Sequence, residues 1–158
     1  MNLIFGASAV VAVAATIMVI TRRNAVHALL YLVVSFLAVA VIMLLLGAAF
    51  VAALEIIIYA GAIMVLFVFV VMLIGHQEIA IPARAWIGPA IMGTLLLAEV
   101  AWVIVNGAPT GPAATAEGPK AVGMSLFGPY IVGTEISAFL LLAGLVGAFH
   151  LGRREGRK

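Results

Sequence analysis

The strongest constraint on the fold is a run of 25 residues, 50–74, that is apolar apart from Glu55, Tyr59 and Gly61. About 20 apolar residues in a helix span a hydrocarbon layer of about 30 Å, so this run is long enough to cross a membrane. Burying a carboxylate in hydrocarbon is expensive, so an acid within such a segment is a candidate functional group. The run predicts a transmembrane helix with a polar site near its start.

The composition is that of an integral membrane protein. Hydrophobic residues make up 66% of the chain and charged residues 9%, against roughly 45–50% and 25% in soluble domains. We expect a single membrane domain over residues 1–158, with no separate soluble domain. The absence of cysteine excludes disulfides, thiolate metal sites and iron–sulfur ligation within the chain.

Apolar runs separated by polar or glycine-containing turns predict an all-α fold of five transmembrane helices. The expected spans are residues 3–20, 25–46, 50–74, 86–105 and 131–151. The segment between the last two, 106–130, holds four of the six prolines and is expected to be a loop with little regular structure.

The basic residues predict the orientation of the chain in the cell inner membrane. Seven of the eight lysines and arginines fall on one side: Arg22, Arg23, Arg84 and the four in residues 153–158. Only Lys120 falls on the other side. The positive-inside rule then places the N-terminus and the proline-rich loop outside, in the periplasm, and the C-terminus in the cytoplasm. The basic residues are therefore explained as topology signals, and no nucleic-acid partner is expected.

Glu55 and Tyr59 are one helical turn apart, and Ile63 follows on the same face, so the acid and the phenol can form one polar strip. The favoured interpretation is that Glu55 is a functional acid within the membrane. The alternative is that Glu55 lies near enough to the outer interface to reach water or to cap a neighbouring helix.

Residues 59–62, Tyr-Ala-Gly-Ala, have two interpretations. Small residues such as Gly61 and Ala62 let neighbouring helices approach closely, which is the ordinary packing explanation and the favoured one. They also permit a π-bulge, a register defect that is frequent at functional sites. Spacing alone does not decide between them.

Three further polar residues lie within predicted spans. Glu99 is well inside the fourth helix, and is either paired with a cation of a partner chain or kept protonated by burial; a proton relay is the less favoured role. Glu135 is expected in the first turn of the fifth helix, where an acid complements the helix dipole. His27 is expected to be a hydrogen-bonded packing residue.

No nucleotide-binding glycine loop, catalytic triad or haem-ligating histidine pair is present, and the three histidines are too scattered to suggest a metal site. The sequence therefore predicts no catalytic, cofactor-binding or metal site in this chain, and any redox chemistry is expected to belong to a partner.

Residues 53–74, ALEIIIYAGAIMVLFVFVVMLI, resemble the third transmembrane helix of the subunit J family of proton-translocating NADH:quinone oxidoreductase, the bacterial respiratory complex I. The resemblance extends to residues 23–40 and more loosely to residues 126–148, together about half of the chain. Glu99 lies outside these stretches, so the resemblance assigns it no role.

The resemblance implies five spans and a place in the membrane arm beside the A, K and H subunits and the antiporter-like subunits. It implies that the third helix can carry a π-bulge at the positions matching Tyr59, Gly61 and Ala62, and that rotation of this helix gates a hydrated proton path. FMN, iron–sulfur clusters, NADH and the quinone would bind to other subunits. The alternatives are a purely structural spacer of the membrane arm, or a subunit of a related membrane hydrogenase or cation antiporter.

Overall fold

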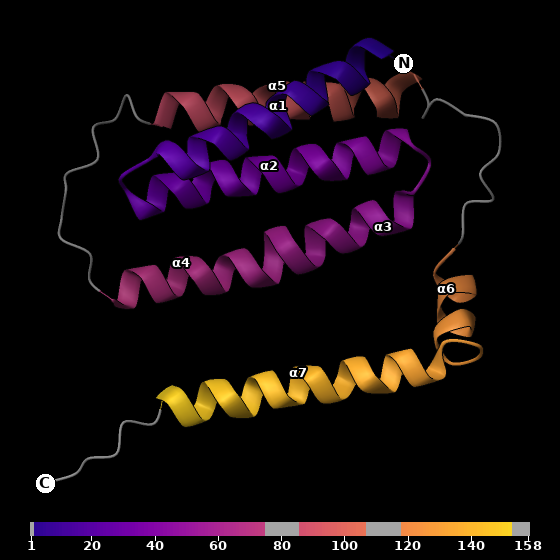
Figure 1. Ribbon diagram of the computed structural model, residues 1–158. Coiled ribbons are helices and arrows are strands. Elements are labelled where there is room, and N and C mark those ends of the chain that lie inside the picture. The colour runs from indigo at the N-terminus through magenta and orange to yellow at the C-terminus, as the bar shows by residue number, and fades with distance from the viewer. Residues whose placement is uncertain (1, 75–85, 107–117, 153–158) are drawn as a thin grey trace, which may run out of the picture. The chain divides into compact units, whose positions relative to one another are not determined.

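The computed structural model describes residues 2–74, 86–106 and 118–152, and these ranges contain helices and short turns but no strand (Figure 1). The chain divides into two compact units, Met1–Ala116 and Glu117–Lys158.

The first unit holds three uninterrupted long helices and one interrupted helix. The uninterrupted ones are α1 (Asn2–Thr21), α2 (Ala25–Leu45) and α5 (Ile87–Asn106). The interrupted helix consists of α3 (Ala49–Leu54), a π-helical segment η1 (Glu55–Ile63) and α4 (Met64–Leu73). The second unit holds the short α6 (Pro119–Leu126) and the long α7 (Ile131–Gly152).

The prediction of five long apolar helices is confirmed. Five helices in the described ranges are long and apolar enough to cross a membrane, the third being the continuous helix Ala49–Leu73. Their bounds differ from the predicted spans by no more than one residue at either end. The orientation of the termini stays a prediction.

Two details of the second unit differ from expectation. The segment 106–130 was expected to have little regular structure, but α6 occupies Pro119–Leu126. Pro119 starts this helix without penalty because a first-turn residue needs no backbone N–H partner. Glu135 is also not in the first turn of α7, which starts at Ile131 and has no acid there. The helix dipole therefore does not explain Glu135.

The core of the first unit lies where α1, α2 and α5 pack against one another, with α1 and α5 on the same side of α2 (Figure 1). Ala15 and Ala38 are fully buried, and such small residues let α1 and α2 approach closely. The remaining core residues repeat at helical spacing: Val11 on α1, Val34, Val41 and Leu45 on α2, and Leu96 and Val103 on α5. The hydroxyls of Thr16 and Ser35, 2.9 Å apart, add a hydrogen bond between α1 and α2.

Two short turns fix the path of the chain around α2. Asn24 caps the start of α2, because its Oδ1 accepts hydrogen bonds from the backbone N–H groups of Val26 and His27 at 3.0 and 3.2 Å. Gly47, between α2 and α3, has φ +84°, a backbone conformation that other L residues adopt only with strain. The sequence thus encodes the sharp reversals on either side of α2.

A small cluster joins the end of α1 to α2 and the start of α5. The guanidinium of Arg22 lies 5.3 Å from the centre of the Tyr31 ring, a cation–π contact. Tyr31 is buried, and its hydroxyl occupies the space that a Cβ at residue 88 would need. Any larger residue at position 88 would therefore have to displace the Tyr31 side chain.

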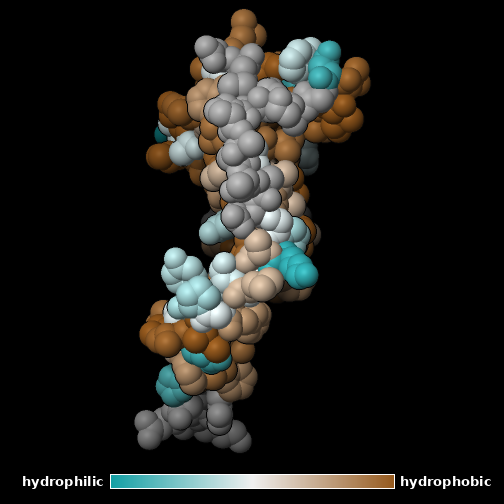
Figure 2. All heavy atoms as spheres, turned by 90° about the vertical axis from the view of Figure 1, so that its right-hand side faces the viewer, coloured by the Kyte–Doolittle hydropathy of each residue, from teal (hydrophilic) through white to brown (hydrophobic). Residues whose placement is uncertain are grey.

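Hydrophobic side chains dominate the coloured surface in Figure 2. Among the described residues of α7 none is buried, and large apolar side chains are exposed along its whole length. An apolar helix of this kind is solvated by lipid or packs against other membrane helices.

Enlarging Ala15 to Leu should destabilise the protein, because the fully buried position between α1 and α2 has no room for a larger side chain. We expect a loss of about 1–3 kcal/mol in the free energy of unfolding, measured as a lower midpoint of thermal unfolding in mild detergent. The same change at Ala101, which is exposed on α5, is the control and should leave the midpoint nearly unchanged.

Candidate functional site

The third long helix is interrupted by nine residues of π-helix, η1. A π-helix replaces the usual i→i−4 backbone hydrogen bonds by i→i−5 bonds; it is rare, and is frequent at functional sites. Four of the five predicted site residues lie in this segment: Glu55, Tyr59, Gly61 and Ala62. Of the two interpretations that the sequence left open for residues 59–62, the structure has the π-helical one.

Gly61 fits the π-helical register specifically. A Cβ built on Gly61 would lie 3.2 Å from the carbonyl oxygen of Ile56, tighter than nearly all ordinary contacts of a Cβ. Ile56 is five residues earlier, which is the residue that the π ladder brings opposite position 61. A side chain at this position would require the Ile56 carbonyl to give way by a few tenths of an ångström, and glycine avoids that contact.

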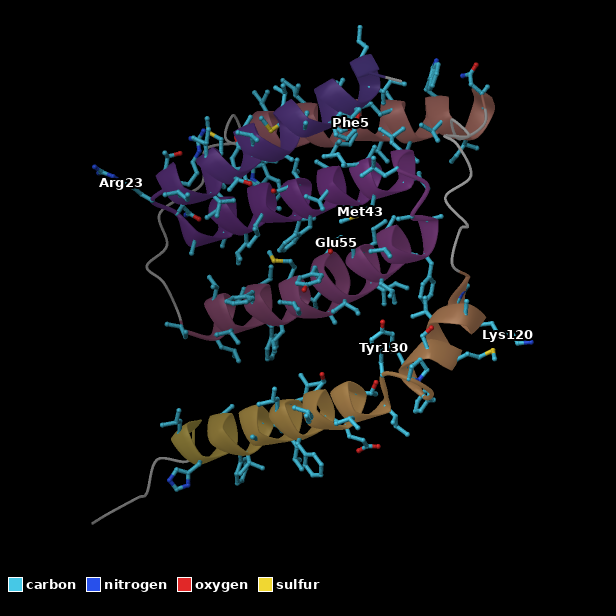
Figure 3. The ribbon with its side chains drawn as sticks, turned by 45° about the vertical axis from the view of Figure 1, so that its right-hand side comes forward. Phe5, Arg23, Met43, Glu55, Lys120 and Tyr130 are labelled. Carbon is cyan, nitrogen blue, oxygen red and sulfur yellow. The ribbon has the colours of Figure 1, made fainter. Side chains whose placement is uncertain are left out.

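The acid and the phenol of η1 lie at accessible positions. Glu55 starts the segment, is half-buried and lies on the side of η1 that faces α2 (Figure 3). Tyr59 is 44% exposed, and its ring packs against Phe36 of α2 with ring centres 5.4 Å apart and planes tilted by 44°. Both polar groups are thus held beside α2 and remain open to partners.

Met64, the first residue after η1, fixes the rotation of α4 about the helix axis relative to α3. Met64 is 2% exposed and starts α4, which packs against α2. Removing the one extra residue of a π turn would rotate α4 relative to α3 by about 100°, the rotation per residue of an α-helix. Such a change would take Met64 out of its buried position, so packing of Met64 favours the π register.

The fifth predicted site residue, Glu99, is buried at a different place. Glu99 on α5 is 8% exposed, and its Oε2 accepts a hydrogen bond of 2.5 Å from the hydroxyl of Ser8, a fully buried residue of α1. The other carboxylate oxygen, Oε1, has no hydrogen-bond partner among the described residues. Sequence reasoning missed Ser8; its signal was a hydroxyl within an otherwise apolar run.

The structure therefore divides the predicted site residues into two groups. Glu55 and Tyr59 lie on η1 beside α2, whereas Glu99 bonds Ser8 between α1 and α5. His27 was expected to be a hydrogen-bonded packing residue. It is buried, but its Nε2 has no hydrogen-bond partner in the described ranges. No three metal-ligating side chains of the described residues come together.

Five apolar helices, a π-helical interruption and a buried acid between two spans define a multi-pass membrane protein with few polar side chains in its spans. Comparison with known proteins shows its family. The family model described as NADH-ubiquinone/plastoquinone oxidoreductase chain 6 matches residues 15–151, and the chain belongs to this family.

Curated relatives match the chain over nearly its whole length. It is 48% identical to NADH-quinone oxidoreductase subunit J of Escherichia coli strain K12, over 98% of this chain and 88% of the relative. It is 46% identical to the subunit J of Pseudomonas aeruginosa over the full length of both, and 36% identical to that of Rhodobacter capsulatus over 93% and 79%. The chain is thus a multi-pass inner-membrane protein of the complex I type.

Replacing Gly61 by Ala should shift η1 toward the α-helical register, because the new methyl group meets the Ile56 carbonyl oxygen. Since the chain has no native cysteine, spin labels can be attached at Cys residues introduced at the exposed Ile20 and Leu66. We expect the distance between the labels to change by several ångströms when α4 rotates, as measured by pulsed electron paramagnetic resonance. A Gly93→Ala control, where a Cβ meets nothing within 4 Å, should leave the distance unchanged; an unchanged distance in both variants would contradict the role assigned to Gly61.

Proposed function

We propose that the chain is a membrane-arm subunit of a proton-translocating NADH:quinone oxidoreductase, and that η1 gates a hydrated proton path in that arm. Membership of the oxidoreductase chain 6 family and the names of the relatives support the first part. The single observation that carries the second part is the π-helical register of Glu55–Ile63 within a membrane-spanning helix.

In this mechanism η1 is a two-state element. The π-helical and α-helical registers differ by a few kcal/mol, so an event elsewhere in the complex can shift the population from one to the other. The change of register rotates α4 by about 100° about its axis and exchanges which side chains face the path. In one register, apolar side chains interrupt a chain of water molecules. In the other register, the chain of water molecules has room to form.

The residues of η1 have separate roles in this proposal. Glu55 and Tyr59 supply polar groups that water can bond at membrane depth, where apolar walls supply none. Gly61 permits the π register by leaving the Ile56 carbonyl uncrowded, and Ala62 leaves room beside it. Glu99, which lies between α1 and α5, is not part of this gate.

The chemistry of electron transfer would be supplied by other subunits. NADH, FMN, the iron–sulfur clusters and the quinone would bind there, and the proposed neighbours in the membrane arm are the A, H, K and antiporter-like subunits. In this proposal the chain couples quinone reduction to proton translocation through the register of η1, and it makes no contact with the reacting groups.

Replacing Gly61 by Val or Leu should impair proton pumping linked to quinone reduction, because the side chain disfavours the π register. A bias of only about 1.4 kcal/mol reduces the population of one register about tenfold. NADH oxidation with an artificial acceptor such as hexacyanoferrate should remain close to normal, since the electron-input module is untouched. Both rates are measured in membrane vesicles.

The matched control for this experiment is Gly93→Val, because a Cβ at this position meets nothing within 4 Å. It should pump normally. If the Gly61 variants assemble the complex fully and pump protons at the parent rate, the gating proposal is contradicted.

Glu55→Gln and Tyr59→Phe distinguish a proton path from a purely structural spacer. Each change keeps the shape of the side chain and removes one proton-exchanging group, so packing and assembly should be preserved while the pumping rate falls severalfold. The proton-to-electron ratio of assembled complexes is the measurement. If both variants assemble and pump like the parent, the spacer function is the better account.

A further inference from the structure

The carboxylate of Glu99 is only half satisfied. Oε2 accepts the hydrogen bond from Ser8, but Oε1 is buried and has no partner among the described residues. A carboxylate offers about four acceptor positions, and a buried charge is stable only when it is paired. The site is therefore incomplete within this part of the chain.

An open cavity of about 470 Å³ adjoins Glu99. Its other lining residues are apolar or aromatic: Leu3 and Ile4 of α1, and Leu95, Ala98 and Trp102 of α5. Leu3, Leu95 and Trp102 are themselves exposed, so the cavity opens at the outer surface of the α1–α5 pair. A long side chain from outside could reach Glu99 by this route.

The free oxygen of Glu99 indicates the chemistry of the missing partner. Ser8 already donates a hydrogen bond of 2.5 Å to Oε2, and the side chains that donate the strongest hydrogen bonds to the remaining oxygen are those of lysine and arginine. In the first unit the described cations are Arg22 and Arg23, at the far end of α1 from Ser8. They lie about 20 Å away, at 1.5 Å per residue along the helix. The partner that fits Oε1 is a cation from elsewhere.

The depth of Glu99 indicates what carries that cation. Glu99 lies seven residues before Asn106, the last residue of α5, and is therefore about 10 Å inside the helix end. Lipid headgroups lie at the membrane surface, outside the hydrocarbon layer that such a helix spans. A cation at this depth must be delivered by another membrane-spanning helix.

We propose that Glu99 and Ser8 form a docking site for a lysine or arginine side chain on a membrane-spanning helix of a neighbouring subunit. The helix packs against the exposed edge formed by α1 and α5, and its basic side chain enters the cavity to bond Oε1. The apolar rim around Leu3, Leu95 and Trp102 excludes water from the pair. The site thus specifies where a neighbour attaches, and it does not depend on the gating of η1.

Glu99→Gln tests the charge requirement in the intact complex in native membranes. The amide keeps the shape of the side chain and an oxygen for Ser8, but leaves the partner cation buried and unpaired. We expect the amount of fully assembled complex on a native gel to fall at least about tenfold. The control is Thr94→Val on the same helix, because Thr94 is exposed and bonds only the carbonyl of Ala90 in its own helix; it should assemble like the parent.

A cross-link made with Glu99 intact avoids any doubt about folding of the variant. The photoreactive residue p-benzoylphenylalanine is placed at Leu95, on the rim of the cavity, and the product is identified by mass spectrometry. We expect capture of a membrane-spanning segment of another subunit that contains lysine or arginine. The same label at Leu97, about 200° round α5, should not capture that segment. Neutralising the captured basic residue should then restore assembly of the Glu99→Gln variant.

Several outcomes would overturn the docking site. They are normal assembly of Glu99→Gln, capture of lipid alone, and capture of a segment of this same chain such as the one holding Lys120. Normal assembly combined with lost proton pumping would instead make Glu99 a proton-carrying acid. None of these outcomes bears on the Gly61 variants, so the two proposals fail separately.

Discussion

In a hydrocarbon layer every backbone N–H and C=O group must be paired within the protein, and the rest of this structure depends on that requirement. A simple break in the third long helix would leave polar groups unpaired, each costing several kcal/mol. The π-helical segment Glu55–Ile63 avoids this, because it shifts the hydrogen-bond ladder by one residue and keeps it continuous. A change between π and α registers is thus a large rotation that the bilayer tolerates.

The first unit combines a closely packed part and a more exposed part. The helices α1, α2 and α5 are held by the buried alanines, the Thr16–Ser35 hydrogen bond and the contact of Arg22 with Tyr31. The segment η1 has no buried residue and rests on α2 through the Tyr59 ring. The two acids follow this division, since Glu55 belongs to the exposed segment η1 and Glu99 to the closely packed helices. Their different surroundings are why one is proposed for gating and the other for attachment.

The five helices could be predicted from hydropathy alone, because a membrane span needs a long apolar run and few other structures use one. The register of residues 59–62 could not, since small residues are compatible with both close packing and a π turn, and close packing, the more common of the two, was favoured. Glu99 was identified as a buried acid, but its bond to Ser8 depends on which faces α1 and α5 turn toward each other, and helix order along the chain does not fix this. The short α6 was missed because prolines and glycines indicate a loop, although Pro119 is well placed to start a helix.

The turn at Gly47 has a consequence for how the protein is made. Only residues 46–48 separate α2 from the third long helix, and Gly47 closes the reversal with its positive φ. The linker is too short for the later helix to enter the bilayer at a distance from the earlier one. During synthesis the two must therefore leave the insertion machinery side by side, as one helical hairpin, so that the π-helical segment meets α2 as soon as it reaches the lipid.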